Sequence, residues 1–483
     1  MFTQILSLGL TDHPSETVSR QYYSPSTITL LSMRVISPPT STPGQLPVDI
    51  QALVNQTISS LKDLVPPTAS IVKDTIKDAI FQAIDAIDAD MRELNLAIHE
   101  NPELGFKEFK AHENLVASLS KLGFDVTNPS SLSTAFVASY THGEDGRVFG
   151  FNSEFDALPN VGHACGHNLI AVVGVAAAVG LKAALKACNI AGTVKLIGTP
   201  AEEGGGGKVI LLREGVYDDL DACAMAHPGG GSGPPEYEGS CTVGGPGTLA
   251  RAGFEIEFFG RGAHAGAAPW MGINALDAAV QGYTAVSMLR QQLEPTMRVH
   301  GIILGSEQWA QNIIPSYSKV SYSTRALDVK SCLELRGKVV ACFKAAAEAT
   351  GCTMKVKAEE DEVYADLRNN EPMAYSYQAF MENVIGQKIT MGGMSTASTD
   401  FGNVCYKVPA IHPGFEIPCP LGSGNHTAGF TESAGKLEAH KLAMKVAKGL
   451  AAVGAKFLVD DSFADETKKA FERFKRGKGR KCQ

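Results

Sequence analysis

The feature that most constrains this chain is the segment His163-Ala-Cys-Gly-His167, which lies between a predicted strand and a predicted helix. The strand covers residues 147–153, and a helix rich in small residues covers 169–187. The order strand, glycine-bearing loop, helix is typical of open α/β sheets, which place their chemistry outside the carboxyl ends of the strands. The sequence therefore predicts an α/β fold with a functional loop at this position.

The same loop carries side chains that bind metals. His163, Cys165 and His167 bring soft ligand atoms together beside Gly162 and Gly166, where the backbone can turn sharply. A single cysteine or histidine in a globular protein is more often a packed core residue. The clustering of these residues after a strand favours a metal site over that interpretation.

Length, charge and cysteine usage limit the protein class. A chain of 483 residues is too long for one ordinary core and predicts two compact domains plus tails. A net charge of -8 argues against a nucleic-acid partner. The ten cysteines lack the dense spacing of a secreted disulfide framework, and the N-terminus lacks the basic region of a signal peptide. No uncharged apolar run approaches the length of a membrane span. We therefore expect a cytoplasmic protein without a membrane partner.

Composition and periodicity divide the chain into segments. We expect a loosely ordered extension rich in Ser, Thr and Pro at 1–75, a discontinuous metal-binding catalytic domain at 76–250 and 370–460, an inserted domain at 251–369, and a basic tail at 461–483 that forms a solvated, mobile end.

Each predicted domain has its own element pattern. Helical spacing at 76–122 is broken at 101–105, which predicts two helices, and a long helix is predicted at 431–457. Between these, strands and helices alternate up to a strand at 222–226 that ends at His227, which indicates a mostly parallel sheet covered by helices. The inserted segment follows a β-α-β-β-α-β order, which predicts a ferredoxin-like domain.

Further ligand candidates fall near the ends of the predicted strands. Glu202 and Glu203 follow the strand at 192–198, His227 ends the next strand, and His426 lies in a glycine-bearing loop. Neighbouring side chains in an extended segment point opposite ways, so one glutamate can bind a metal while the other faces the substrate. A solvated pair at a helix start is the alternative for these glutamates. Beside Cys165, the pattern favours metal-assisted hydrolysis, in which a free glutamate moves the proton.

Seven motifs together resemble the M20 family of metallopeptidases and amidohydrolases, in the branch that uses a cysteine ligand. They are IHENPELGFKE at 98–108, EFDALPNVGHACGHNLI at 154–170, TPAEEGGGGK at 199–208, GRGAHAGAAPWMGINALDA at 260–278, NIIP at 312–315, STDFGNV at 398–404 and GNHTAGF at 424–430. They cover the chain from about 76 to 460 in the order of the family. Within this branch, the chain is similar to a subgroup of dipeptidases for substrates of the β-alanyl-lysine type.

The resemblance implies two divalent metal ions, zinc or manganese, and a role for each candidate residue. The implied ligands are Cys165 as the bridge, His167 and His227 on one ion, and Glu203 and His426 on the other. Glu202 would be the general base, and Asp156 would orient a metal ligand.

The resemblance also gives the inserted domain the role of a lid that forms a homodimer. His264 would hold the developing oxyanion, and Asn312 and Arg325 would bind the substrate. Without the resemblance, His264 is an ordinary polar turn residue and Arg325 a surface strand arginine. Asn168 stands where many relatives have aspartate, which removes one negative charge near the site.

Three functional hypotheses follow. The first is a binuclear metal hydrolase that cleaves a dipeptide or an N-acyl amino acid through a metal-activated water, with Glu202 as acid and base. The second is an amidohydrolase of an acylated small metabolite, because one scaffold hosts many substrates. The third is a non-catalytic, metal-stabilised dimeric binding protein, which predicts the loss of the base or of ligands; this chain has all of them.

Overall fold

The structure is a computed structural model that describes residues 72–231, 239–305, 309–358, 361 and 363–479. All of them belong to one compact unit, Pro66–Gln483. The predicted N-terminal extension lies outside the described residues, apart from its last few positions.

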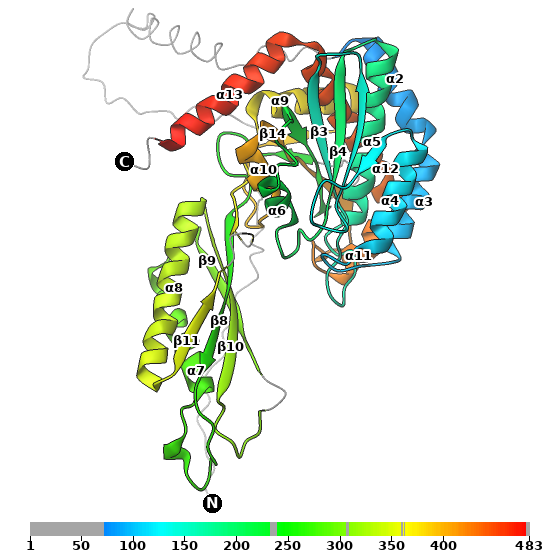
Figure 1. Cartoon of the computed structure of the whole chain (residues 1–483). Helices are drawn as coiled ribbons and strands as arrows, with labels where there is room; N and C mark the ends of the chain where they lie inside the picture. Colours follow the sequence, from blue (N-terminus) through cyan, green and yellow to red (C-terminus); the bar gives the residue numbers. More distant parts are fainter. Residues whose placement is uncertain (1–71, 232–238, 306–308, 359–360, 362, 480–483) are drawn as a thin grey trace, which may run out of the picture. The chain divides into compact units, whose positions relative to one another are not determined.

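The central sheet has six strands in the order β1-β2-β4-β3-β5-β14 (Figure 1). The bounds are β1 (Asp125–Thr127), β2 (Phe136–His142), β4 (Gly192–Thr199), β3 (Arg147–Glu154), β5 (Ala222–Ala224) and β14 (Ala410–Ile411). Strands β4, β3, β5 and β14 run parallel to their neighbours in this row, whereas β1 and β2 are antiparallel. The predicted mostly parallel sheet is confirmed.

Helices cover both faces of this sheet, because successive strand residues point to opposite sides. In β2, Phe136 belongs to a core shared with helices α2, α5 and α12, whereas Val137 belongs to a second core shared with α6 and α10. The covering helices are α2 (Asp74–Ala86), α3 (Asp88–His99), α4 (Phe109–Lys121), α5 (His167–Ala187), α6 (Gly207–Arg213), α9 (Glu371–Phe380), the π-helix η4 (Met381–Ile385), α10 (Phe401–Lys407), α11 (Ala428–Ala434) and α12 (Leu437–Val459).

Two predicted helices are each divided in the structure. The first pattern contains a break at Ile87, between α2 and α3, in addition to the predicted turn before α4. The long C-terminal helix is likewise divided between α11 and α12, at Gly435 and Lys436. Hydrophobic spacing continued across both breaks, so the sequence pattern did not reveal them.

Helix α5 is the innermost helix of the catalytic domain. It packs against β3, β4, α2 and α12, and its apolar residues are buried on all sides. Among the described residues it is also the one helix long and apolar enough to cross a membrane, which the search for uncharged runs did not anticipate. Because 83% of that apolar window is buried inside the fold, α5 behaves as a core helix.

A second sheet was not predicted. Its order is β13-β7-β15-β6, with β13 (Ile389–Met391), β7 (Gly239–Cys241), β15 (Gly414–Pro418) and β6 (His227–Gly231). The prediction that His227 ends the preceding strand is therefore wrong in detail, because β5 stops at Ala224 and His227 begins β6. The glycine-rich composition of β6 hid this strand, since glycine is depleted in strands.

The inserted domain has the predicted ferredoxin-like order. Its elements are β8 (Ala250–Phe259), η1 (Pro269–Met271), α7 (Ala275–Leu289), η2 (Arg290–Gln292), β9 (Arg298–Leu304), β10 (Tyr317–Ala326), α8 (Val329–Thr350), β11 (Thr353–Lys357) and β12 (Val363–Tyr364). The antiparallel sheet runs β11-β8-β10-β9, and β12 also pairs with β8. Helices α7 and α8 share a core with one face of this sheet, and Figure 1 shows α8 running along the strands.

The C-terminal segment differs from its prediction. Asp461–Gly479 forms helix α13, so the expected solvated, mobile end is wrong for these residues. The side chains of Phe463, Ala464 and Thr467 are buried, and α13 packs against α9 and α12. The basic residues masked this apolar stripe because they dominate the composition of the segment.

Candidate metal and active site

The site lies at the carboxyl edge of the parallel strands. Strand β3 ends at Glu154 and leads to Asp156, while β4 ends at Thr199 and leads to Glu202 and Glu203. Parallel strands bring such ends to one edge of the sheet.

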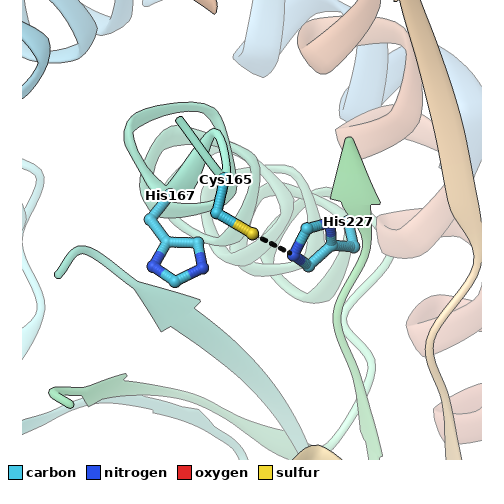
Figure 2. A group of neighbouring side chains, drawn as sticks. All are labelled: Cys165, His167 and His227. Carbon is cyan, nitrogen blue, oxygen red and sulfur yellow. Dashed lines mark hydrogen bonds between the residues drawn. The ribbon is translucent and has the colours of Figure 1, made fainter. Parts of the chain in front are cut away.

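Cys165 and His167 come from the turn that begins α5. Gly166 is the residue before the helix and has φ +80°, a left-handed conformation that glycine adopts without a steric penalty. A Cβ at this position would come within 2.5 Å of Pro228 Cγ, so a larger residue would push away the strand that carries His227. Figure 2 shows Cys165 and His167 at the helix start with His227 alongside.

The five predicted metal ligands form two groups. Cys165, His167 and His227 form one, and Cys165, Glu203 and His426 form the other; within each group the ligand atoms lie within 4.8 Å of one another. Cys165 Sγ is 3.4 Å from His227 Nε2, and Glu203 Oε1 is 3.5 Å from His426 Nε2. Cys165 is the residue that both groups share, whereas His163 belongs to neither.

Asp156 connects the two loops of the site. One carboxylate oxygen lies 3.0 Å from His167 Nδ1, and the other accepts a hydrogen bond from the Glu203 backbone N–H at 3.0 Å. Burial by itself lowers the pKa of His167, but the charge of Asp156 and its hydrogen bond outweigh burial and raise that pKa well above its usual value. With Nδ1 directed at Asp156, His167 Nε2 is the ring atom that faces the ligand groups.

Several buried atoms in this cluster fit a cation. Within the part of the chain that the structure describes, His167 Nε2 and Glu203 Oε1 are buried without a hydrogen-bond partner. Burial raises the pKa of the Cys165 thiol, so ionisation of this thiol requires a nearby positive charge. A thiolate, imidazoles and a carboxylate form a donor set that suits zinc or manganese. The residues present therefore fit divalent metal ions.

Glu202 is a buried carboxylate next to these groups. Its Oε2 lies 3.8 Å from His167 Nε2. Burial, together with the negative charges of Glu154 and Glu203, raises the pKa of Glu202 well above its usual value. A carboxyl group with a raised pKa can take up and release a proton near neutral pH, which general acid-base catalysis requires.

The loop that carries Glu202 holds backbone strain. Ala201, directly before Glu202, has φ +56°, and His426 has φ +69°. Non-glycine residues seldom adopt this conformation, and such outliers concentrate at functional sites. The Tyr364 hydroxyl donates to the Glu202 carbonyl at 2.9 Å, and Glu108 accepts the Ala201 N–H at 2.9 Å. These hydrogen bonds fix the loop from two sides.

Sequence reasoning missed a buried charge network beneath the site. Lys208 Nζ lies 2.6 Å from Glu154 Oε1 and 2.7 Å from Asp400 Oδ1, and all three side chains are fully buried. The other oxygen of Glu154 is 3.5 Å from His167 Nε2. Glu154 ends a predicted strand, so the strand-end rule could have found it, but no sequence signal pointed to Lys208.

His412 was also missed. It follows β14, and its ring centroid lies 5.8 Å from that of His227. Burial lowers the pKa of His412 well below its usual value. A histidine at the end of a fourth parallel strand fits the same rule that found the other residues.

Asn168, the expected departure from many relatives, faces away from the ligand groups. Its Nδ2 donates to Asn95 Oδ1 at 2.6 Å and to the Ala434 carbonyl at 3.0 Å. This amide therefore joins α5 to α3 and α11.

The three lid residues are held in two separate places. The His264 turn forms a bridge with Ile313, and the Asn312 carbonyl accepts the Ala265 N–H at 2.9 Å. Nδ1 of His264 accepts the N–H groups of Gly266 and Ala267, which leaves its Nε2 as the donor. Arg325 instead donates to the Thr396 carbonyl and to Ser398 Oγ at 3.0 and 3.2 Å.

The fold and the ligand groups are those of a metal-dependent peptidase or amidohydrolase. Residues 150–448 match the model of peptidase family M20/M25/M40, and the chain belongs to this family.

Individual relatives agree with this assignment. An Xaa-Arg dipeptidase of Mus musculus is 39% identical over 427 residues, which cover 84% of this chain and 95% of the relative. A p-aminobenzoyl-glutamate hydrolase protein of Escherichia coli is 28% identical over 459 residues, covering 79% and 92%. A solved dinuclear metal binding peptidase of the M20 family from Bacillus subtilis shares the fold, with a TM-score of 0.58, 20% identity and coverage of 77% and 99%.

Proposed function

We propose that this chain is a binuclear metal-dependent hydrolase that cleaves the amide bond of a dipeptide or of an N-acyl amino acid. The observation that carries the proposal is the pair of ligand groups that share Cys165, with the buried carboxylate of Glu202 beside them. The relatives named as a dipeptidase and as an aminobenzoyl-glutamate hydrolase support the same bond type.

In this proposal each ligand group holds one divalent ion. Cys165, His167 and His227 would hold the first, and Cys165, Glu203 and His426 the second. When bound, such a pair supplies Lewis acidity that activates a water and polarises the scissile carbonyl. Zinc and manganese both suit these donors.

Glu202 is the proposed general base. Its carboxylate takes a proton from the attacking water and delivers it to the leaving amine, and its raised pKa fits both steps. Asp156 keeps His167 in the required orientation through the 3.0 Å contact with Nδ1.

The lid provides the proposed substrate contacts. His264 directs its Nε2–H outward as a hydrogen-bond donor, which suits an oxyanion. Arg325 is anchored through one terminal nitrogen, so its remaining N–H groups can bind a carboxylate. Asn312 lies beside the His264 turn and is the third proposed contact.

We propose that the protein is a cytoplasmic homodimer that associates through the lid. Strand β9 is the last strand of the lid sheet, and its Ile302 is 58% exposed. On α7, Tyr283 and Met288 are also exposed. An unpaired sheet edge with exposed apolar side chains favours association with a second copy. Ile302→Asp should shift sedimentation from dimer to monomer, and an unchanged dimer would contradict this interface.

The experiment that tests the function is hydrolysis by metal-reconstituted protein of β-alanyl dipeptides, ordinary dipeptides and N-acyl amino acids, with a chelated control. Release of the amine from one class, abolished by the chelator, is the expected result and identifies that class. Absence of turnover on all three, with two ions bound per chain, would contradict the proposal and favour an acylated metabolite or a binding role.

A further inference from the structure

Three arginines lie in one row across the lid sheet. Arg325 of β10 pairs directly with Arg251 of β8 on one side and with Arg298 of β9 on the other. Residues directly opposite each other in antiparallel strands project to the same face. The neighbours Ala252, Ala326 and Val299 belong to the cores on the helix-covered side. The arginines therefore project from the open face.

Elsewhere on this face, charges of opposite sign are paired. Lys319 Nζ lies 2.9 Å from Glu255 Oε1, and Lys357 Nζ lies 3.3 Å from Glu257 Oε2. Opposite charges on neighbouring strands stabilise a sheet, whereas like charges directly opposite destabilise it. The directly opposed Arg298 and Arg325 therefore depart from the pattern of the rest of the face.

These two arginines bind neutral groups. Within the described part of the chain, neither Arg298 nor Arg325 forms an ion pair. Arg298 donates instead to backbone carbonyls, including that of Met297 at 2.8 Å. Burial, followed by the charges of Arg325 and Arg251, lowers the pKa of His300, so these side chains act on one electrostatic field. The positive charge of Arg298 and Arg325 is thus open to a bound anion.

The row also adjoins the active site. Arg325 donates to the Thr396 carbonyl and to Ser398 Oγ, and its pKa responds, after burial and Arg251, to the charge of Glu202. An excess of positive charge in a protein of net charge -8, next to the proposed base, is suited to an anionic substrate.

The geometry points to a substrate whose amine-side residue carries two carboxylates, as glutamate or aspartate does. This inference rests on the proposed function and specifies its substrate class. Neighbouring strands lie about 4.8 Å apart, so the backbone of Arg298 lies about 5 Å from that of Arg325. If Arg325 binds the α-carboxylate, the side chain of the same residue lies within the field of Arg298. A second carboxylate is attracted there, and a cationic side chain is repelled.

The test compares β-alanyl-glutamate, β-alanyl-glutamine and β-alanyl-lysine, which share one acyl group. We expect kcat/KM to be about tenfold higher for the glutamate substrate than for the glutamine substrate, the effect of one charge-assisted contact. Arg298→Gln should reduce this ratio at least severalfold. Arg336→Gln is the matched control, because it removes an arginine from α8, on the covered side of the sheet, and should leave the ratio unchanged.

Binding provides a readout that does not depend on turnover. Calorimetric titration of the same three compounds into the Glu202→Gln variant should give the tightest dissociation constant for the glutamate compound, and Arg298→Gln should weaken it. Equal or tighter binding of the lysine compound, or a ratio unaffected by Arg298→Gln in a folded variant, would overturn the inference. Hydrolysis of the lysine substrate with such a result would leave the proposed function intact. If the metal-loaded protein cleaves none of the three, the proposed function fails for them, and the titration alone decides the inference.

Discussion

The ligand groups of the catalytic domain and the arginine row of the lid are both clusters of unbalanced charge, but of opposite sign and in opposite environments. Around His167, buried carboxylates outnumber the buried cation Lys208. On the lid, arginines occur in one row on the open face. A buried negative cluster requires a small cation that enters the fold, whereas a positive row on an open face suits an anion that binds and leaves. The sign and depth of each cluster thus predict its ligand.

The largest expected effect comes from the residue that both ligand groups share. Cys165→Ala removes a donor from each group at once, so metal content should fall below one ion per chain and hydrolysis to background. Cys223→Ala is the matched control, because Cys223 is also buried but belongs to neither group. Elemental analysis of both variants provides the measurement, and two retained ions in Cys165→Ala would refute the shared position.

Glu202→Gln keeps the shape of the base and removes its ability to carry a proton. Because Glu202 lies outside the two proposed ligand sets, the variant should retain two ions per chain while kcat falls by about 10²–10⁴-fold. Steady-state kinetics with parallel metal analysis separates these effects. Unchanged turnover would exclude Glu202 as the base, and loss of an ion would make it a ligand.

Burial should determine how much each ion pair stabilises the fold. Lys208→Met leaves Glu154 and Asp400 buried without their cation, and should lower the free energy of unfolding by about 3–5 kcal/mol. Lys319→Met breaks a pair whose side chains are 28% and 35% exposed and should cost at most about 1 kcal/mol. Denaturant unfolding of both variants in chelator measures the difference. Equal losses would show that the two regions do not differ in this respect.

The smallest expected effect is that of salt. Exposed charges are screened at high ionic strength, whereas buried pairs are screened much less. Raising the salt concentration from about 0.05 to about 0.5 M should therefore increase KM severalfold through the arginine row, with kcat and metal content nearly unchanged. Michaelis-Menten kinetics across a salt series would show this, and a fall in kcat at constant KM would place the sensitivity in the catalytic domain.

Much of the catalytic domain followed from local sequence. Cys165, His167, Glu202 and Glu203 were found because they follow strands, and parallel strands bring their ends to one edge. His227 was found for the same reason, although its strand assignment was wrong. The ferredoxin-like order of the lid was also readable, because its helices and strands have clear periods.

The sequence by itself thus determined the fold class, the lid topology and the candidate ligands, because these depend on periodicity and on residues close to strand ends. Only the tertiary structure joined Lys208 to Glu154 and Asp400, and only the strand register brought Arg251, Arg298 and Arg325 into one row. These residues are far apart in the chain. Their contacts depend on which strands pair and in which register, and the hydrophobic pattern of one segment does not reveal its partner.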